Sequence, residues 1–230
     1  MIPRILISLA CMAAALSLVA QSSNTPTVRS ILAASGSTDS SLLPDYCLDT
    51  QVAPKGAERY IQVSCHLNPS AEQLFVFSRD ATLRGELFGW TLATLPNDFI
   101  VYHNSEVHFA PTHSLGISVF DPATLSDKKI YPPVPYQPVR SAFIARVADA
   151  YRQRGDDWFR EHNHPRNPEF FDSSLQGDVI VTASLKSFSF TVRYGDPENA
   201  NDPLPFTQMV RVTCSPFDSL EQLRCSETAQ

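Results

Sequence analysis

Short runs of β-forming residues, each bounded by turn residues, are the feature that most limits how this chain can fold. They are rich in Val, Ile, Phe and Tyr, and they end at Pro, Gly, Asn or Asp. The runs are "RYIQVSCHL", "QLFVFSRDATLRGELFGW", "DFIVYH", "ISVF", "KKIYP", "DVIVTASL", "FSFTVRYG" and "MVRVTCS". The 18 prolines against 8 glycines indicate stiff connections between the runs. The sequence therefore predicts a mainly β fold.

One segment departs from this pattern. Apolar side chains recur at helical spacing in "PVRSAFIARVADAYRQRG", at Val139, Phe143, Val147 and Tyr151. Pro138 precedes the segment and Gly155 ends it. We expect one amphipathic helix near 139–153, within an insertion at 139–165, packed on an edge of the β structure. The alternative is a helix that binds a partner.

The N-terminus has the pattern of a secretory signal peptide over residues 1–22. Arg4 precedes an uninterrupted apolar and small-residue run from Ile5 to Ala20, and polar residues follow. Cleavage after Ala20 or after Ser22 fits the pattern, while a lipoprotein site at Cys11 and an uncleaved anchor are the alternatives. We therefore expect a bacterial protein exported to the periplasm or out of the cell.

Composition divides the rest of the chain into a linker and a domain. Residues 23–45 are rich in Ser, Thr and Ala and nearly free of aromatic residues, which predicts a flexible linker. Residues 46–230 are then one β-rich domain, with no transmembrane segment after signal cleavage. The formal charge of −6, without any basic cluster, argues against a nucleic-acid partner.

Four cysteines remain after signal cleavage. An even number in an exported chain predicts two disulfide bonds, for which three pairings exist. We favour the two local pairs, because neither needs a special topology. The predicted bonds join Cys47 to Cys65 and Cys214 to Cys225.

Two stretches of the chain resemble each other. "VFSRDATLRGELF" begins at Val76 and "VFDPATLSDKKIY" at Val119, 43 residues later, and both return after a turn containing Ala-Thr-Leu. Asp121 is placed to cap its own turn, and Pro122 presets the backbone angle of the next turn position. Each stretch therefore predicts a β-hairpin.

The spacing and the Asp-Pro-x-Thr turn give residues 76–131 a resemblance to the blade hairpins of β-propellers. This resemblance implies architecture only, since propellers serve as enzymes, receptors and scaffolds. No fourth unit is visible, so we expect a twisted antiparallel meander or an incomplete propeller-like fold. An open sheet edge must then be covered by the helix or by a second copy of the chain, which makes an oligomer through a β edge one expectation.

A histidine cluster is the candidate metal site. The segment "YHNSEVHFAPTHSLG" contains His103, Glu106, His108 and His113, a composition that suits zinc or another divalent ion. On a strand, however, Glu106 and His108 share a face and His103 points to the other. The alternative is a set of histidines that hydrogen-bond to the backbone.

A second polar segment, "WFREHNHPRNPEFFD", combines aromatic rings with cationic side chains. Its candidate binding residues are Trp158, Arg160, His162, His164 and Phe170. Rings supply contact area and Arg stacks on them, which favours a binding surface. The alternative is a small core beneath a long loop.

The sequence carries no catalytic or cofactor fingerprint. It lacks a GxSxG elbow, a Walker loop, a dinucleotide-binding glycine motif and a CxxCH haem site. We therefore expect a non-enzymatic exported domain that binds a protein or glycan partner or supports an envelope assembly, without a cofactor. The alternative is a metal-dependent or other hydrolase that uses the histidine cluster.

Overall fold

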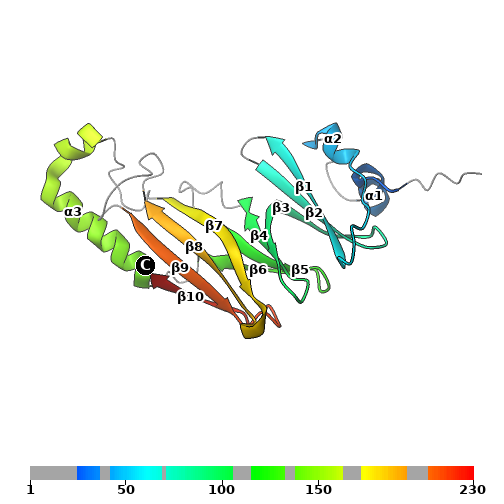
Figure 1. The fold of residues 1–230 in the computed structure, drawn as a ribbon. Helices are drawn as coiled ribbons and strands as arrows, with labels where there is room; N and C mark the ends of the chain where they lie inside the picture. Colours follow the sequence, from blue (N-terminus) through cyan, green and yellow to red (C-terminus); the bar gives the residue numbers. More distant parts are fainter. Residues whose placement is uncertain are drawn as a thin grey trace, which may run out of the picture.

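The computed structural model describes residues 25–36, 42–68, 71–105, 115–132, 138–162, 172–195 and 207–230. Within them the protein is mainly β, with two antiparallel sheets and three α-helices (Figure 1). Both sheets are meanders in which consecutive strands are neighbours, as predicted. Among the helices described here, none is long and apolar enough to cross a membrane.

The first sheet has six strands in the order β1-β2-β3-β4-β5-β6. Their bounds are β1 (Tyr60–Asn68), β2 (Ala71–Ser78), β3 (Leu83–Thr94), β4 (Ile100–Asn104), β5 (Ile117–Asp121) and β6 (Ser126–Tyr131). The two similar stretches of sequence form the β2–β3 and β5–β6 hairpins. Asp121 caps the second turn as expected, because its carboxylate accepts from the Ala123 amide at 2.8 Å and the Thr124 hydroxyl at 2.7 Å. The resemblance to propeller blades stays a prediction.

Strand β3 bends at Gly89 and belongs to two layers. Its first half pairs with β2 and its second half with β4. Gly89 has φ of 134°, and a Cβ built there would lie 1.6 Å from the carbonyl oxygen of His103, so only glycine fits. The bend brings Gly85 against the ring of Phe120 in β5. The Arg84 guanidinium then binds the carbonyls of Pro122 and Ala123 at 3.0 and 2.9 Å.

The bend makes β4 and β5 a central layer with a core on each face. All residues of both strands are buried. Ile100, Tyr102 and Phe120 pack toward β2, whereas Val101, Ile117 and Val119 pack toward the second sheet. This double burial is the reason why "DFIVYH" and "ISVF" are almost continuously apolar.

The second sheet has four strands in the order β10-β9-β8-β7. Their bounds are β7 (Asp172–Thr182), β8 (Ser187–Gly195), β9 (Gln208–Ser215) and β10 (Arg224–Ala229), with a 3₁₀ turn at Ala183–Leu185. Alternate residues of β8 are buried against the central layer, namely Phe188, Phe190, Val192 and Tyr194. Cys214 lies directly opposite Cys225 and is bonded to it, which matches the predicted pairing.

Helix α3 (Pro138–His162) packs on the second sheet, at the far end from α1 in Figure 1. Phe143, Val147 and Ala150 are buried in the core between the central layer and the second sheet, which we call the main core. The Phe143 ring stacks on the Tyr194 ring, with the ring centroids 5.6 Å apart. The amphipathic helix near 139–153 is confirmed. The sequence predicted that the helix ends at Gly155, but helical residues continue to His162 after a break at Gly155, where φ is 74°.

Two helices cover the outer face of β1 and β2, and one of them corrects the predicted linker. The linker prediction for residues 23–45 overlooked α1 (Val28–Ser35), whose Val28 and Leu32 are buried in a core with α2 (Asp45–Leu48). Thr27 and Ser30 form a capping box at its start. Few apolar residues are needed for so short a helix, so its composition resembled that of a disordered segment.

Candidate functional site

A groove of about 470 Å³ opens at the free edge of the six-stranded sheet. Two stretches of the chain line it. One is β1 from Tyr60 to Ser64, and the other is the segment between Thr50 and Glu58 that leads into β1. Lys55 and Glu58 are the charged residues in this lining, and their formal charges cancel. We call this cavity the β1 groove.

The backbone of β1 turns every second residue toward the β1 groove. The Ser78 amide bonds to the Thr82 carbonyl in the β2–β3 turn, so Phe77 and Phe75 direct their backbone groups toward β1. These residues pair with Ile61 and Val63. The residues of the other parity in β1, Tyr60, Gln62, Ser64 and His66, therefore point their N–H and C=O groups away from β2.

A tyrosine closes one end of this edge. The Tyr46 hydroxyl, on α2, donates to the carbonyl of His66 at 2.5 Å. His66 has the outward parity, so this bond agrees with the direction derived from the β2–β3 turn. Between Tyr60 and Ser64, no backbone hydrogen bond outside the β1–β2 ladder is found among the described residues. The open part of the edge is therefore the part that lines the β1 groove.

The opposite side of the β1 groove is held in an extended form. The Val28 amide binds the Thr50 carbonyl at 3.1 Å, and the Val52 amide binds the Pro26 carbonyl at 2.8 Å. Gln51 and Ala53 have the opposite parity, and both line the β1 groove. Of the backbone hydrogen bonds described here, none joins residues 50–58 to residues 60–64.

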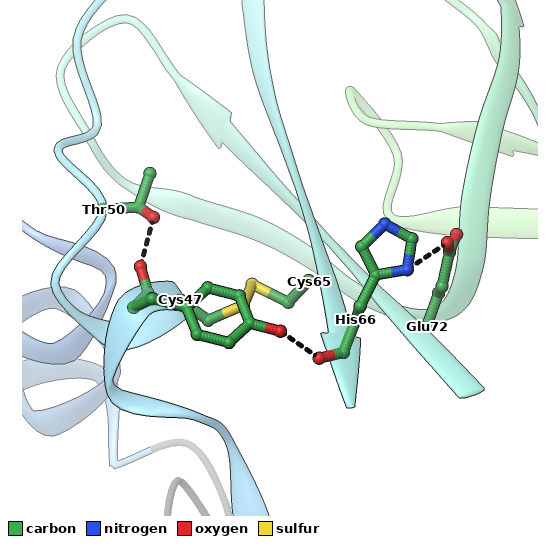
Figure 2. Close-up of a disulfide and its surroundings, with 6 residues drawn as sticks. Cys47, Thr50, Cys65, His66 and Glu72 are labelled. Atoms are coloured by element: carbon green, nitrogen blue, oxygen red, sulfur yellow. Dashed lines mark hydrogen bonds and ion pairs between the residues drawn. A yellow bond between two sulfur atoms is a disulfide. The ribbon is translucent and has the colours of Figure 1, made fainter. Parts of the chain in front are cut away.

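A disulfide and several polar contacts fix the frame of the β1 groove (Figure 2). Cys47 on α2 is bonded to Cys65 on β1, as predicted, with the Cα atoms 5.6 Å apart. The Thr50 hydroxyl donates to the Tyr46 carbonyl at 2.8 Å, and His66 Nδ1 lies 2.5 Å from a carboxylate oxygen of Glu72. The walls of the β1 groove are therefore cross-linked before any ligand arrives.

An arginine adds an exposed cross-link between α1 and α2. The Arg29 guanidinium lies 2.7 Å from a carboxylate oxygen of Asp45 and 3.0 Å from one of Asp49. These hydrogen bonds, with Asp45 first, raise the pKa of Arg29. The pair of contacts orients α1 against the turn that leads into the β1 groove.

The predicted aromatic surface falls mostly outside the description. Trp158, Arg160 and His162 belong to α3, so this part of the segment is helical and not a loop. Their side chains, together with all of His164 and Phe170, lie outside the described part of the structure. The binding surface predicted from these residues stays a prediction.

The predicted metal site is described only at His103. This side chain is buried in β4, and its ring stacks on Trp90 at 3.8 Å. Glu106, His108 and His113 lie outside the described residues. The residues that are described contain no group of three or more His, Cys, Asp or Glu that could hold a metal ion.

Three titratable side chains form a buried hydrogen-bonded chain in the main core, and the sequence analysis did not predict it. The Tyr131 hydroxyl donates to the Tyr194 hydroxyl at 2.6 Å, and Tyr194 donates to a carboxylate oxygen of Glu227 at 3.1 Å. Burial raises the pKa of both tyrosines and of Glu227. Tyr131 and Tyr194 are at most 2% exposed, so no substrate reaches their hydroxyls. We therefore assign these hydrogen-bonded side chains a structural role in the core.

A second groove, of about 460 Å³, lies among the turns at one end of the sheets. Its carboxylates are Asp121, Asp218 and Glu221. Asp121 caps its own turn, and Asp218 is paired with Lys186 at 3.0 Å. Two of the three carboxylates therefore have structural partners, and the β1 groove is the site that combines open backbone groups with a fixed frame.

Comparison of the chain with protein families, with characterised proteins and with solved structures gives no match. Function is therefore inferred from the site itself. The β1 groove offers backbone donors and acceptors on a rigid frame, which is the chemistry of binding. Sequence analysis had no signal for it, because backbone groups are the same at every non-proline residue.

Proposed function

We propose that this chain is an exported, non-enzymatic β-domain that binds a partner protein through the β1 groove. The observation that carries the proposal is the open backbone of Tyr60, Gln62 and Ser64 at the edge of a sheet fixed by the Cys47–Cys65 disulfide. Proteins rarely leave such an edge open, because it attracts other chains. A site kept open on a rigid frame favours a binding role.

Export is supported by two independent features. The first 22 residues have the order of a signal peptide, with Arg4 before an apolar run. The structure also pairs all four cysteines of the region after residue 22, and disulfide bonds persist in oxidising compartments. A periplasmic or extracellular location fits both features.

Capture of a partner tests the proposed function. The protein with both disulfides formed is immobilised and exposed to the exported proteins of its own cell, and bound proteins are cross-linked and identified. Trp at Ala53 fills the β1 groove, whereas Trp at Ala57 adds the same ring to the adjacent turn outside the lining. We expect Ala53→Trp to lose the partner and Ala57→Trp to keep it.

The result that rejects the proposed function is equally clear. A partner that binds wild type and Ala53→Trp alike places binding elsewhere on the molecule. Repeated capture of nothing, together with turnover of a substrate by protein that carries a stoichiometric divalent metal, favours the hydrolase alternative. Elemental analysis of protein purified without chelator decides the metal question.

A further inference from the structure

The length of the β1 groove suits one additional strand. Five residues from Tyr60 to Ser64 span about 14 Å at about 3.4 Å per residue. The β1 groove, with a volume of about 470 Å³, runs along these five residues. An added strand would lie about 4.8 Å from β1, which is the spacing of paired strands.

We propose that the ligand is an extended segment of the partner polypeptide, which adds to the sheet as a strand between β1 and residues 51–53. This inference rests on the proposed function and names its ligand class. Tyr60, Gln62 and Ser64 each present one N–H and one C=O to the incoming strand. Gln51 and Ala53 present theirs from the other side. Strand addition satisfies both rows of groups at once.

The incoming strand runs antiparallel to β1. Residues 51–55 and β1 are joined by a turn at Gly56, so they run in opposite directions. A strand between them is antiparallel to one and parallel to the other. The antiparallel ladder is the more stable per residue, and β1 offers the longer open stretch. The Tyr46–His66 bond limits the new ladder at the C-terminal end of β1.

The other strands at the sheet edges have neighbours. The Lys128 ammonium of β6 donates to the carbonyls of Leu220 and Leu223, both at 2.8 Å, so the β9–β10 loop covers that edge. β7 lies against β3, and α3 contacts β10. Among the described residues, the stretch of β1 along the groove is therefore the edge with room for another chain.

A second copy of this protein fits the β1 groove poorly. The β1 strand of a second copy is flanked by its own residues 50–58, which would have to enter the same groove together with the strand. A segment without such a flanking arm meets no such obstacle. The occupant is therefore a single extended segment of another protein.

The lining also determines the chemistry of that segment. Ile61 and Val63 point to the helix-covered core, whereas Gln62 bonds to Thr91 and Thr94 on the opposite face. Paired strands match side chains face by face, so the segment alternates polar and apolar residues. It contains no proline, and its binding depends little on salt because Lys55 and Glu58 cancel.

Amide exchange with a defined probe tests strand addition. The probe is the capped heptapeptide Thr-Val-Thr-Val-Thr-Val-Thr, and its control has every second amide N-methylated. We expect the plain peptide to slow exchange of the Tyr60, Gln62 and Ser64 amides at least tenfold. The Ile61 and Val63 amides, which already face β2, keep their exchange rates. The methylated peptide has no effect.

Matched variants separate this inference from the proposed function. Ala53→Trp weakens peptide binding at least tenfold, and Ala57→Trp leaves it unchanged, with the thermal unfolding of both compared with wild type. No slowing at the three outward amides overturns strand addition. If the natural partner is still lost in Ala53→Trp, the proposed function stands and its ligand is then a folded surface or a glycan on that partner. Dimerisation blocked by Ala53→Trp also overturns the inference, because a second copy then occupies the edge.

Discussion

Removal of the Tyr194 hydroxyl tests the buried polar chain in the main core. This hydroxyl accepts from Tyr131 and donates to Glu227, and the residue is 2% exposed. Tyr194→Phe loses the bond to a carboxylate and leaves the Tyr131 hydroxyl buried without its acceptor, for a cost of about 3 kcal/mol. Tyr131→Phe loses one neutral hydrogen bond and leaves the Tyr194–Glu227 bond intact, for about 1 kcal/mol.

The double variant gives the sharper result. With both hydroxyls gone, no buried donor lacks an acceptor, so Tyr131→Phe in the Tyr194→Phe background recovers about 1 kcal/mol. Urea unfolding at neutral pH, with the disulfides intact and a constant m-value, measures all three free energies of unfolding. Tyr46→Phe, which removes an exposed hydroxyl bonded to the His66 carbonyl, serves as the control and should cost no more than about 1 kcal/mol. Equal costs for Tyr131→Phe and Tyr194→Phe, or costs that simply add, would refute the reasoning.

Three further changes probe the Cys47–Cys65 disulfide, the Glu227 carboxyl and the bend at Gly89. Replacing Cys47 and Cys65 together by Ser opens a link across 18 residues, and urea unfolding should show a loss of about 3 kcal/mol; a loss below about 1 kcal/mol contradicts this. Burial raises the pKa of Glu227 above the ordinary 4.5, so its contribution to stability is complete below pH 4.5 and is lost as pH rises through the folded pKa. Glu227→Gln should remove this part of the pH dependence, and parallel pH–stability curves for variant and wild type contradict it. Gly89→Ala forces a Cβ into the His103 carbonyl, so thermal unfolding should show a stability loss of at least about 3 kcal/mol, or the variant should not fold. An unfolding temperature equal to that of wild type contradicts the bend at Gly89.

The strands were predictable where one residue pattern has one physical meaning. The run "FSFTVRYG" was predicted as a strand from its β-forming residues, and the structure has β8 there, with Phe188 and Phe190 buried. The helix followed from the spacing of Phe143 and Val147, which face the main core. The two disulfides followed from the even number of cysteines and their closeness in sequence.

The arrangement of the layers and the β1 groove could not be predicted from the sequence. Nothing in the sequence shows that β3 changes layer at Gly89, because an isolated glycine in a strand also fits a bulge or a close approach. Helix α1 was missed because Val28 and Leu32 are its only buried residues. The β1 groove depends on which side of an edge strand is covered, a tertiary property. Aromatic and histidine clusters drew attention instead, since reactive side chains are visible in a sequence and open backbone is not.

The central layer has a consequence for a chain that is exported as we propose. β4 and β5 contribute side chains to two cores, one on each face. On the face toward the second sheet, these side chains are covered by Phe190 of β8 and Val212 of β9. A chain that crosses a membrane from its N-terminus delivers Val101 and Val119 well before those strands arrive. During that interval the apolar face of β4 and β5 is exposed and can aggregate with other unfolded chains in the compartment. Because β8 and β9 are the later strands to cross the membrane, we expect a periplasmic or extracellular chaperone to bind the chain until they have been translocated.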